Sequence, residues 1–89
     1  MSRQWNHVCT FSAGIDDLPR RKQRNPHDVA RVLARAGRFS VFEATANDTI
    51  AKTMDWLSDS GWFVFDHESQ GFPWTKVTLT DMGRKVLSL

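Results

Sequence analysis

The sequence predicts an α+β fold in which three helices are followed by a two-stranded hairpin and a short C-terminal helix. Three observations support this fold class: capping residues precede the helical segments, apolar residues recur with helical spacing, and two short strand-like runs flank a turn. The chain of 89 residues fits a single domain. Its six Phe and four Trp residues supply the bulky side chains that so small a core needs.

The first helix is predicted to begin after Asn25 and to end before Gly37. Asn is a favourable N-cap, Pro26 suits the first helical position, and Asp28 suits the positive end of the helix dipole. Gly37 is a typical C-cap. One helical face carries the apolar residues Val29, Val32, Leu33 and Ala36.

Two further helices are predicted before the hairpin. Ser40 and Glu43 form a capping-box pattern that starts a short helix. Asn47 or Asp48 caps a third helix, which ends at Gly61. The apolar stripe of this third helix consists of Ile50, Met54 and Leu57.

The hairpin is predicted from two runs separated by a turn-rich segment. Residues 62–65 are aromatic or β-branched, and residues 74–79 place Thr, Val and Leu alternately on one face. Thr80 then caps a last helix that runs to about Leu87. Gly83 inside this helix costs about 1 kcal/mol relative to Ala, so we expect the helix to fray.

The N-terminal part of the chain has no clear period. The scattered apolar residues of segment 1–18 leave three placements open: packing on the domain, exchange between protomers, or a mobile arm. Residues 19–25, PRRKQRN, predict a basic polar linker. We therefore expect an N-terminal arm and basic linker in residues 1–25 and the folded domain in residues 26–89.

Charge is distributed unevenly along the chain. Residues 1–40 hold eight Lys or Arg against three Asp, a net charge of +5, and residues 41–89 hold four basic against seven acidic residues, a net charge of −3. A basic half attracts polyanions. The predicted third helix has one Lys and three Asp between residues 48 and 60, so it does not share this character.

Three segments, in order, give the chain a resemblance to known regulators. Residues 49–57 carry a small polar residue and an apolar stripe, residues 60–64 a Gly turn into a strand, and residues 79–87 the pattern Leu-Thr-x-x-Gly-Arg-x-x-Leu. These resemble the recognition helix, the turn into the wing and the segment after the wing in winged helix-turn-helix proteins, especially the MarR family of bacterial repressors. The resemblance covers residues 26–87 and implies a small winged helix-turn-helix domain.

The chain departs from the MarR pattern in two ways. Segment 40–47 is about one helical turn shorter than usual, which abbreviates the first helix of the helix-turn-helix. The long terminal helices through which MarR proteins dimerise have no room in this chain, so the resemblance does not specify a dimer, although a homodimer stays open. The compact size and the FPWTK segment also resemble small prophage proteins.

The first functional hypothesis is a cytoplasmic, phage-derived transcriptional regulator that binds double-stranded DNA. In a winged helix the third helix enters the major groove and the wing contacts the DNA backbone. The residues expected to face the groove are Thr49, Lys52, Thr53 and Trp56. The arm is expected to hold phosphates through Arg20, Arg21, Lys22 and Arg24, and the wing through Lys76.

The alternative hypothesis is a winged helix that binds a protein, as an adaptor or a phage inhibitor of a host protein. The acidic third helix favours a protein partner over DNA, because contacts with DNA phosphates need cationic side chains and this helix has mostly acidic ones. Trp is enriched at interaction hot spots, although Trp56 can equally pack against the hairpin or the arm. The residues expected to contact a protein partner are Asp55, Trp56 and Asp59.

Other classes of function find no support in the sequence. The single cysteine, Cys9, allows no intrachain disulfide and suits a reducing cytoplasm. His7, Cys9, His27 and His67 match no zinc spacing, no nucleophile–base motif is present, and no Gly-rich phosphate loop occurs. No stretch has the length of a membrane span. We therefore expect no enzymatic activity, no cofactor, no metal and no membrane partner.

Overall fold

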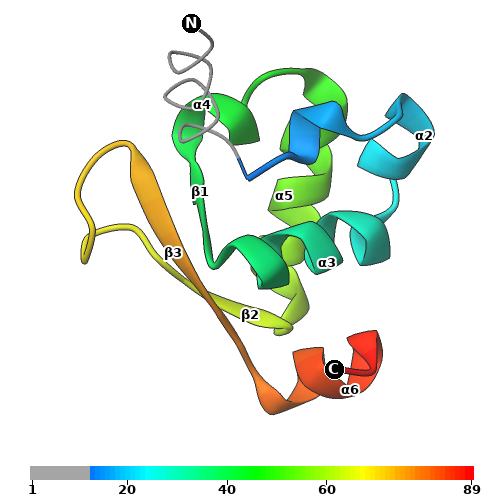
Figure 1. The fold of residues 1–89 in the computed structure, drawn as a ribbon, viewed down its shortest axis with the longest axis vertical. Helices are drawn as coiled ribbons and strands as arrows, with labels where there is room; N and C mark the ends of the chain where they lie inside the picture. The colour runs from blue at the N-terminus through cyan, green and yellow to red at the C-terminus, as the bar shows by residue number, and fades with distance from the viewer. Residues whose placement is uncertain (1–12) are drawn as a thin grey trace, which may run out of the picture.

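A computed structural model of the chain describes residues 13–89 and shows an α+β fold with five α-helices and a three-stranded antiparallel sheet (Figure 1). The elements, in order, are the 3₁₀ turn η1 (Ile15–Asp17), α2 (Arg20–Gln23), α3 (Pro26–Ala36), β1 (Arg38–Ser40), α4 (Val41–Ala44), α5 (Asp48–Ser60), β2 (Phe63–Asp66), β3 (Trp74–Leu79) and α6 (Asp81–Leu87). No helix within residues 13–89 has both the length and the apolar character needed to cross a bilayer.

The helix boundaries follow the predicted caps. The Asn25 side chain accepts a hydrogen bond from the His27 backbone N–H at 2.9 Å, and Gly37 ends α3 with φ 78°. The Ser40 hydroxyl accepts from the Glu43 N–H at 3.2 Å at the start of α4, and the Asn47 side chain accepts from the Ile50 N–H at 2.8 Å at the start of α5. These contacts satisfy N–H groups that the first helical turn leaves unpaired.

The sheet has one strand more than the sequence predicts. Strand β3 lies in the centre, pairing with β2 on one side and with β1 on the other, with Phe39 opposite Thr75. The predicted hairpin is present as the antiparallel pair β2–β3, and β1 is a third strand that was not predicted. A three-residue strand is too short to show the alternation by which strands are recognised.

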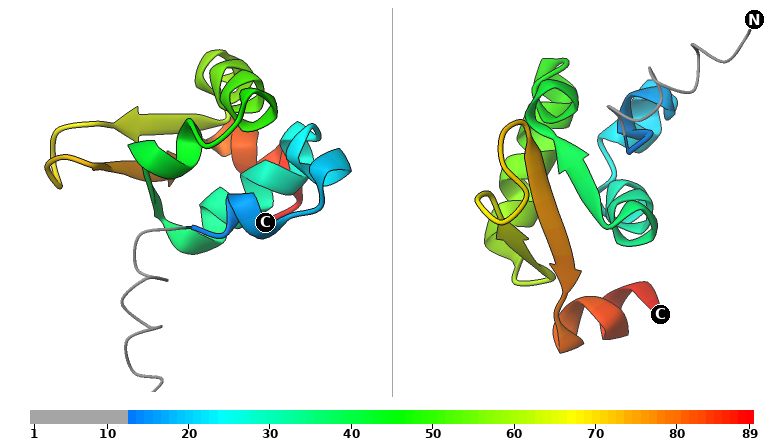
Figure 2. Two further views of the ribbon diagram at one scale, coloured as in Figure 1. Left: turned by 90° about the horizontal axis from the view of Figure 1, so that it is seen from above. Right: turned by 60° about the vertical axis from the view of Figure 1, so that its left-hand side comes forward.

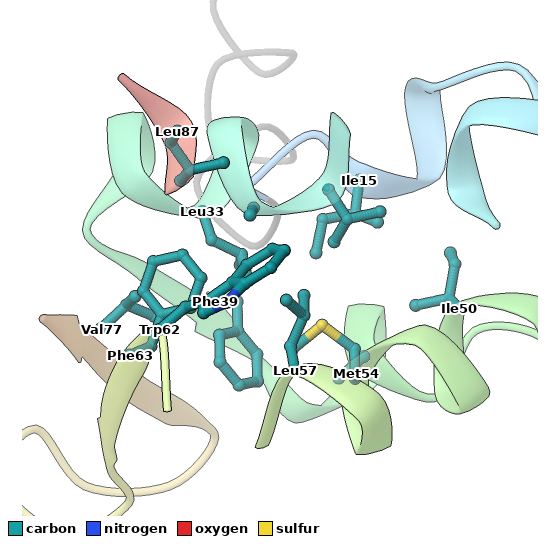
Figure 3. Close-up of a cluster of buried hydrophobic side chains, with 13 residues drawn as sticks. Ile15, Leu33, Phe39, Ile50, Met54, Leu57, Trp62, Phe63, Val77 and Leu87 are labelled. Carbon is teal, nitrogen blue, oxygen red and sulfur yellow. The ribbon is translucent and has the colours of Figure 1, made fainter. Parts of the chain in front are cut away.

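The core lies between the sheet and the helices that cover one of its faces. Figure 3 shows Leu33 of α3 and Leu57 of α5 pointing toward Phe39 and Val77 of the sheet. Leu33 and Leu57 are fully buried. Leu87, near the end of α6, is also buried, which attaches the C-terminal helix to the same core.

Residues 13–25 belong to this core as well, so the prediction of a linker over residues 19–25 is wrong. Ile15 is fully buried, and α2 is a helical turn that packs against α3 and α5. Within the described residues, the boundary predicted between residues 25 and 26 does not separate two bodies. Residues 1–12, with His7 and Cys9, lie outside the described part of the chain, so the placements left open for them stay predictions.

A buried carboxylate attaches the start of the described chain to α4. Glu43 is only 4% exposed, and its side chain accepts hydrogen bonds from four consecutive backbone N–H groups. The four donors are Ala13, Gly14, Ile15 and Asp16. The Glu43 side chain therefore makes a tertiary contact that its place in the capping-box pattern did not predict.

Candidate nucleic-acid interface

The cationic segment is a structured element fixed to the start of α5. Arg20, Arg21, Lys22 and Arg24 are all exposed, whereas Gln23 between them is buried. The Gln23 backbone carbonyl accepts a hydrogen bond from the Thr53 hydroxyl at 2.6 Å, and its side-chain oxygen accepts from the Asn47 amide at 3.2 Å. The Gln23 amide donates to the Leu18 carbonyl at 2.9 Å.

Thr53 was expected to contact nucleic acid, but its side chain is buried and its hydroxyl links α5 to α2. Its side chain is 6% exposed, and its hydroxyl lies 3.1 Å from the Thr49 carbonyl as well as close to the Gln23 carbonyl. A hydroxyl used in this way inside the protein has little capacity left for a phosphate or a base.

The structure brings part of the predicted arm beside the predicted recognition face. A surface groove of about 320 Å³ runs between the end of α2 and the first half of α5. Its walls are formed by Arg24, Pro26, Asp48, Thr49, Lys52, Thr53 and Trp56. Arg24 and Lys52 are the cations of this groove and Asp48 is its acid, so its formal charge is +1.

Trp56 is half exposed at the edge of this groove. Its accessible fraction is 50%, and its ring meets the buried Trp62 ring edge-to-face with 5.1 Å between centroids. Trp62 in turn lies 5.0 Å from the His27 ring. The expectation that Trp56 packs against the hairpin region is met on one side only, because half of the indole surface stays open to solvent.

Lys76 does not join this groove. It is exposed on β3, where its sheet partners are Arg38 on β1 and Asp66 on β2. Figure 2 and Figure 1 place α2 and the tip of the β2–β3 hairpin on opposite sides of the molecule. The Arg38 guanidinium lies 3.9 Å from the Trp74 ring centroid, so a second cationic site, which was not among the predicted site residues, accompanies Lys76 on the sheet.

The C-terminal half of α5 carries the acidic surface. Asp55 and Asp59 are exposed there, one and two turns beyond Lys52. The β2–β3 connection adds Asp66, whose carboxylate accepts from the backbone N–H groups of Glu68 and Ser69. These hydrogen bonds, that of Glu68 first, lower the pKa of Asp66, and the nearby Lys76 adds to the effect.

A second hollow, of about 450 Å³, lies between α4, α5 and the hairpin. Its walls are mostly apolar and include Phe39, Met54, Phe65 and Trp74, with Asp55 among the polar members. At its edge Phe72 is 81% exposed and meets Phe42, itself 62% exposed, edge-to-face at 5.7 Å. No sequence pattern predicted this exposed aromatic pair, because Phe42 comes from α4 and Phe72 from the β2–β3 connection, and the two meet only in the fold.

No protein-family model, curated protein or solved structure matches the chain. Among residues 13–89, no three His, Cys, Asp or Glu side chains are grouped so that they can hold a metal ion.

Proposed function

We propose that this protein is a winged helix domain that binds nucleic acid, and that it acts as a small transcriptional regulator on double-stranded DNA. The order helix, strand, short helix, helix, hairpin from α3 to β3 supports the winged helix reading, with α5 as the recognition helix and β2–β3 as the wing. The sheet order β1-β3-β2 agrees with that arrangement.

One observation carries the proposal: the fold fixes the cationic segment α2 against the start of α5. Arg24 and Lys52, which are 28 positions apart in the sequence, line one groove. Phosphate contacts supply most of the affinity of proteins for nucleic acid. The neighbouring Arg20, Arg21 and Lys22 extend this positive surface along the exposed side of α2.

The test is a fluorescence-anisotropy titration with random-sequence duplex DNA at several salt concentrations. We expect affinity to fall steeply with salt, and the triple variant Arg20→Ala/Arg21→Ala/Lys22→Ala to bind more weakly with a flatter dependence. Each lost phosphate contact reduces the slope of log K against log salt by about 0.9.

A matched control removes three cations from elsewhere on the surface. Arg35, Arg84 and Lys85 are exposed on α3 and α6, and Figure 1 places α6 and α2 at opposite ends of the molecule. Their triple alanine variant should retain most of the salt slope. Equal loss in both triple variants would mean that net charge alone attracts DNA, and absence of binding at low salt would exclude the proposal.

A second candidate function is a winged helix that binds a protein partner. The exposed Asp55 and Asp59 and the half-exposed Trp56 support it, and the aromatic pair Phe42–Phe72 offers a further apolar contact surface. Exposed aromatic side chains beside a hollow are typical of hot spots in protein interfaces.

These two functions predict different effects of the same variants. If the partner is a protein that binds through α5, Trp56→Ala should abolish its capture while the thermal unfolding midpoint of the domain stays close to wild type. Removal of Arg20, Arg21 and Lys22 should then leave capture unchanged. Loss of capture in that basic-segment variant instead would argue against α5 as the protein-binding surface.

A further inference from the structure

We propose that the groove beside Trp56 binds an unpaired nucleotide, with the indole stacked on the base and with Arg24 and Lys52 holding the neighbouring phosphates. This inference rests on the proposed nucleic-acid binding and adds to it a site for a nucleotide that is unpaired, for example at the end of a duplex. The shared chemistry is a single-stranded nucleotide, in DNA or in RNA.

The indole of Trp56 is presented as a stacking platform. Its edge-to-face contact with Trp62, which is 7% exposed, fixes the ring on one side while half of its surface faces solvent. Proteins that bind single strands use aromatic rings held in this way, since every base has a face that stacks. The exposed half of this indole lies beside the cations of the groove and is free to contact a ligand.

The groups around Trp56 match the rest of a nucleotide. Arg24 and Lys52 line the same groove and supply charges for phosphate, and the Thr49 side chain adds a hydroxyl one turn from Lys52. The volume of about 320 Å³ lies within the range of small-ligand sites. Asp48 is the one acidic residue among the lining residues of this groove.

The charge of α5 disfavours a duplex laid along its whole length. Asp55 lies next to Trp56, and Asp59 follows one turn later, both exposed. The phosphates of a B-form duplex that contacts Lys52 would also approach these carboxylates, which repel them. A single strand that contacts only Arg24, Lys52 and Trp56 avoids this repulsion.

The test compares four fluorescein-labelled probes by anisotropy at one fixed, low salt concentration: oligo-dT, oligo-rU, a blunt duplex, and the same duplex with a single-stranded overhang. We expect oligo-dT or oligo-rU, and the overhang duplex, to bind more tightly than the blunt duplex. The ratio between oligo-dT and oligo-rU distinguishes DNA from RNA as the source of the unpaired nucleotide.

The variant Trp56→Ala should weaken binding of the single strand by about tenfold, a loss that lies within the range contributed by stacking on one aromatic ring. Trp56→Phe, which keeps an aromatic face, should restore part of the loss. Phe72→Ala removes an even more exposed aromatic ring outside the groove and should change nothing. Lys52→Gln, at an exposed position, should also weaken binding of the single strand, and it leaves the contact between Trp56 and Trp62 in place.

The outcomes separate this inference from the proposed function. Salt-dependent duplex binding with no preference for single strands, or single-strand binding unchanged in both Trp56→Ala and Lys52→Gln, would overturn the stacking site and leave the duplex-binding function in place. A lack of binding to all four probes would overturn both.

Discussion

Gly83 lies where α6 packs closely against Trp62 and Leu79. A Cβ at this position would lie 2.2 Å from the Trp62 carbonyl oxygen and 2.8 Å from a Leu79 methyl carbon. Both distances are far inside van der Waals contact. The glycine that weakens the helix by its backbone freedom therefore permits α6 to pack against the turn after α5.

We expect Gly83→Ala to lower the free energy of unfolding by about 1–3 kcal/mol, because the added methyl group overpacks a buried site. In an isolated helix the same change would stabilise. Urea denaturation with linear extrapolation measures the difference, and Arg84→Ala, at the next and exposed position, is the control. If the Gly83→Ala protein is as stable as wild type, the prediction is wrong, and α6 can shift to accept the methyl group without loss of stability.

Thr53 shows how much of a single residue's role the sequence predicts. Its position is three residues after Ile50 and four before Leu57, which places it on the buried stripe of α5. The spacing alone therefore predicts burial, and the polar hydroxyl favoured an exposed role. Its buried partner, the Gln23 carbonyl, comes from a distant segment and has no signal in the sequence.

At the scale of elements, the turn after β2 depends on Asp66. The carboxylate is 3.0 Å from the N–H groups of both Glu68 and Ser69 and thereby fixes the start of the β2–β3 connection. A side chain that bonds the backbone two residues ahead replaces a backbone turn contact. The same hydrogen bonds favour the charged form and lower the pKa of Asp66.

The turn should make stability depend on pH in the acid range. The pKa of Asp66 is lower in the folded protein than its ordinary value of 3.8, so its contribution is complete above that value and is lost as the pH falls through the folded pKa. We expect Asp66→Asn to flatten this part of the curve of unfolding free energy against pH. Asp59→Asn is a control at an exposed helical carboxylate. Identical curves for wild type and Asp66→Asn would show that this turn does not contribute to the dependence of stability on pH.

The elements that the sequence predicts are those whose ends are encoded locally. The helices α3, α4 and α5 begin at the side-chain caps that were expected, and β3 has the predicted bounds. The missed elements, α2 and β1, span four and three residues. A helix this short is unstable by itself. Helix α2 is held by the hydrogen bond from Thr53 of α5 to Gln23, and β1 is held by its pairing with β3. Local sequence patterns contain neither contact.

At the scale of the whole molecule, Glu43 joins the first described residues to α4. Four N–H groups, from Ala13 to Asp16, donate to its carboxylate across 27 to 30 positions of sequence. Hydrogen bonds to a charged group are stronger than those between neutral groups. Removing one partner of such a bond therefore costs more stability. Glu43 therefore supplies a group of hydrogen bonds that attach the segment before α2, in addition to the burial of Ile15.

We expect Glu43→Ala to lower the free energy of unfolding by about 2–3 kcal/mol and to increase hydrogen exchange at residues 13–16 more than elsewhere. Glu43→Gln, whose side chain has a similar shape and keeps one acceptor oxygen, should lower the free energy of unfolding by less. Exchange followed by mass spectrometry locates the change. Uniform faster exchange over residues 13–89 would mean that Glu43 supports the whole fold and not this attachment.

The candidate site could be predicted only in parts. The basic run and the outward face of α5 are visible as charges and spacing, and Arg24, Lys52 and Trp56 were all among the predicted residues. Their meeting in one groove was not predicted, because it depends on the turn of α2 and on the buried Gln23. Lys76 was assigned to the hairpin, and it lies on β3 outside this groove.

The attachment of α2 through Gln23 also bears on the thermodynamics of recognition. A flexible basic arm loses conformational entropy when it settles on a polyanion, and this loss reduces its affinity. Here the backbone of Arg20–Gln23 is already ordered in the unbound protein, so that loss occurs during folding. Preorganised charges of this kind favour rapid encounter over adaptability. In the proposed function, Gln23 thereby influences the strength of nucleic-acid binding without itself contacting the nucleic acid.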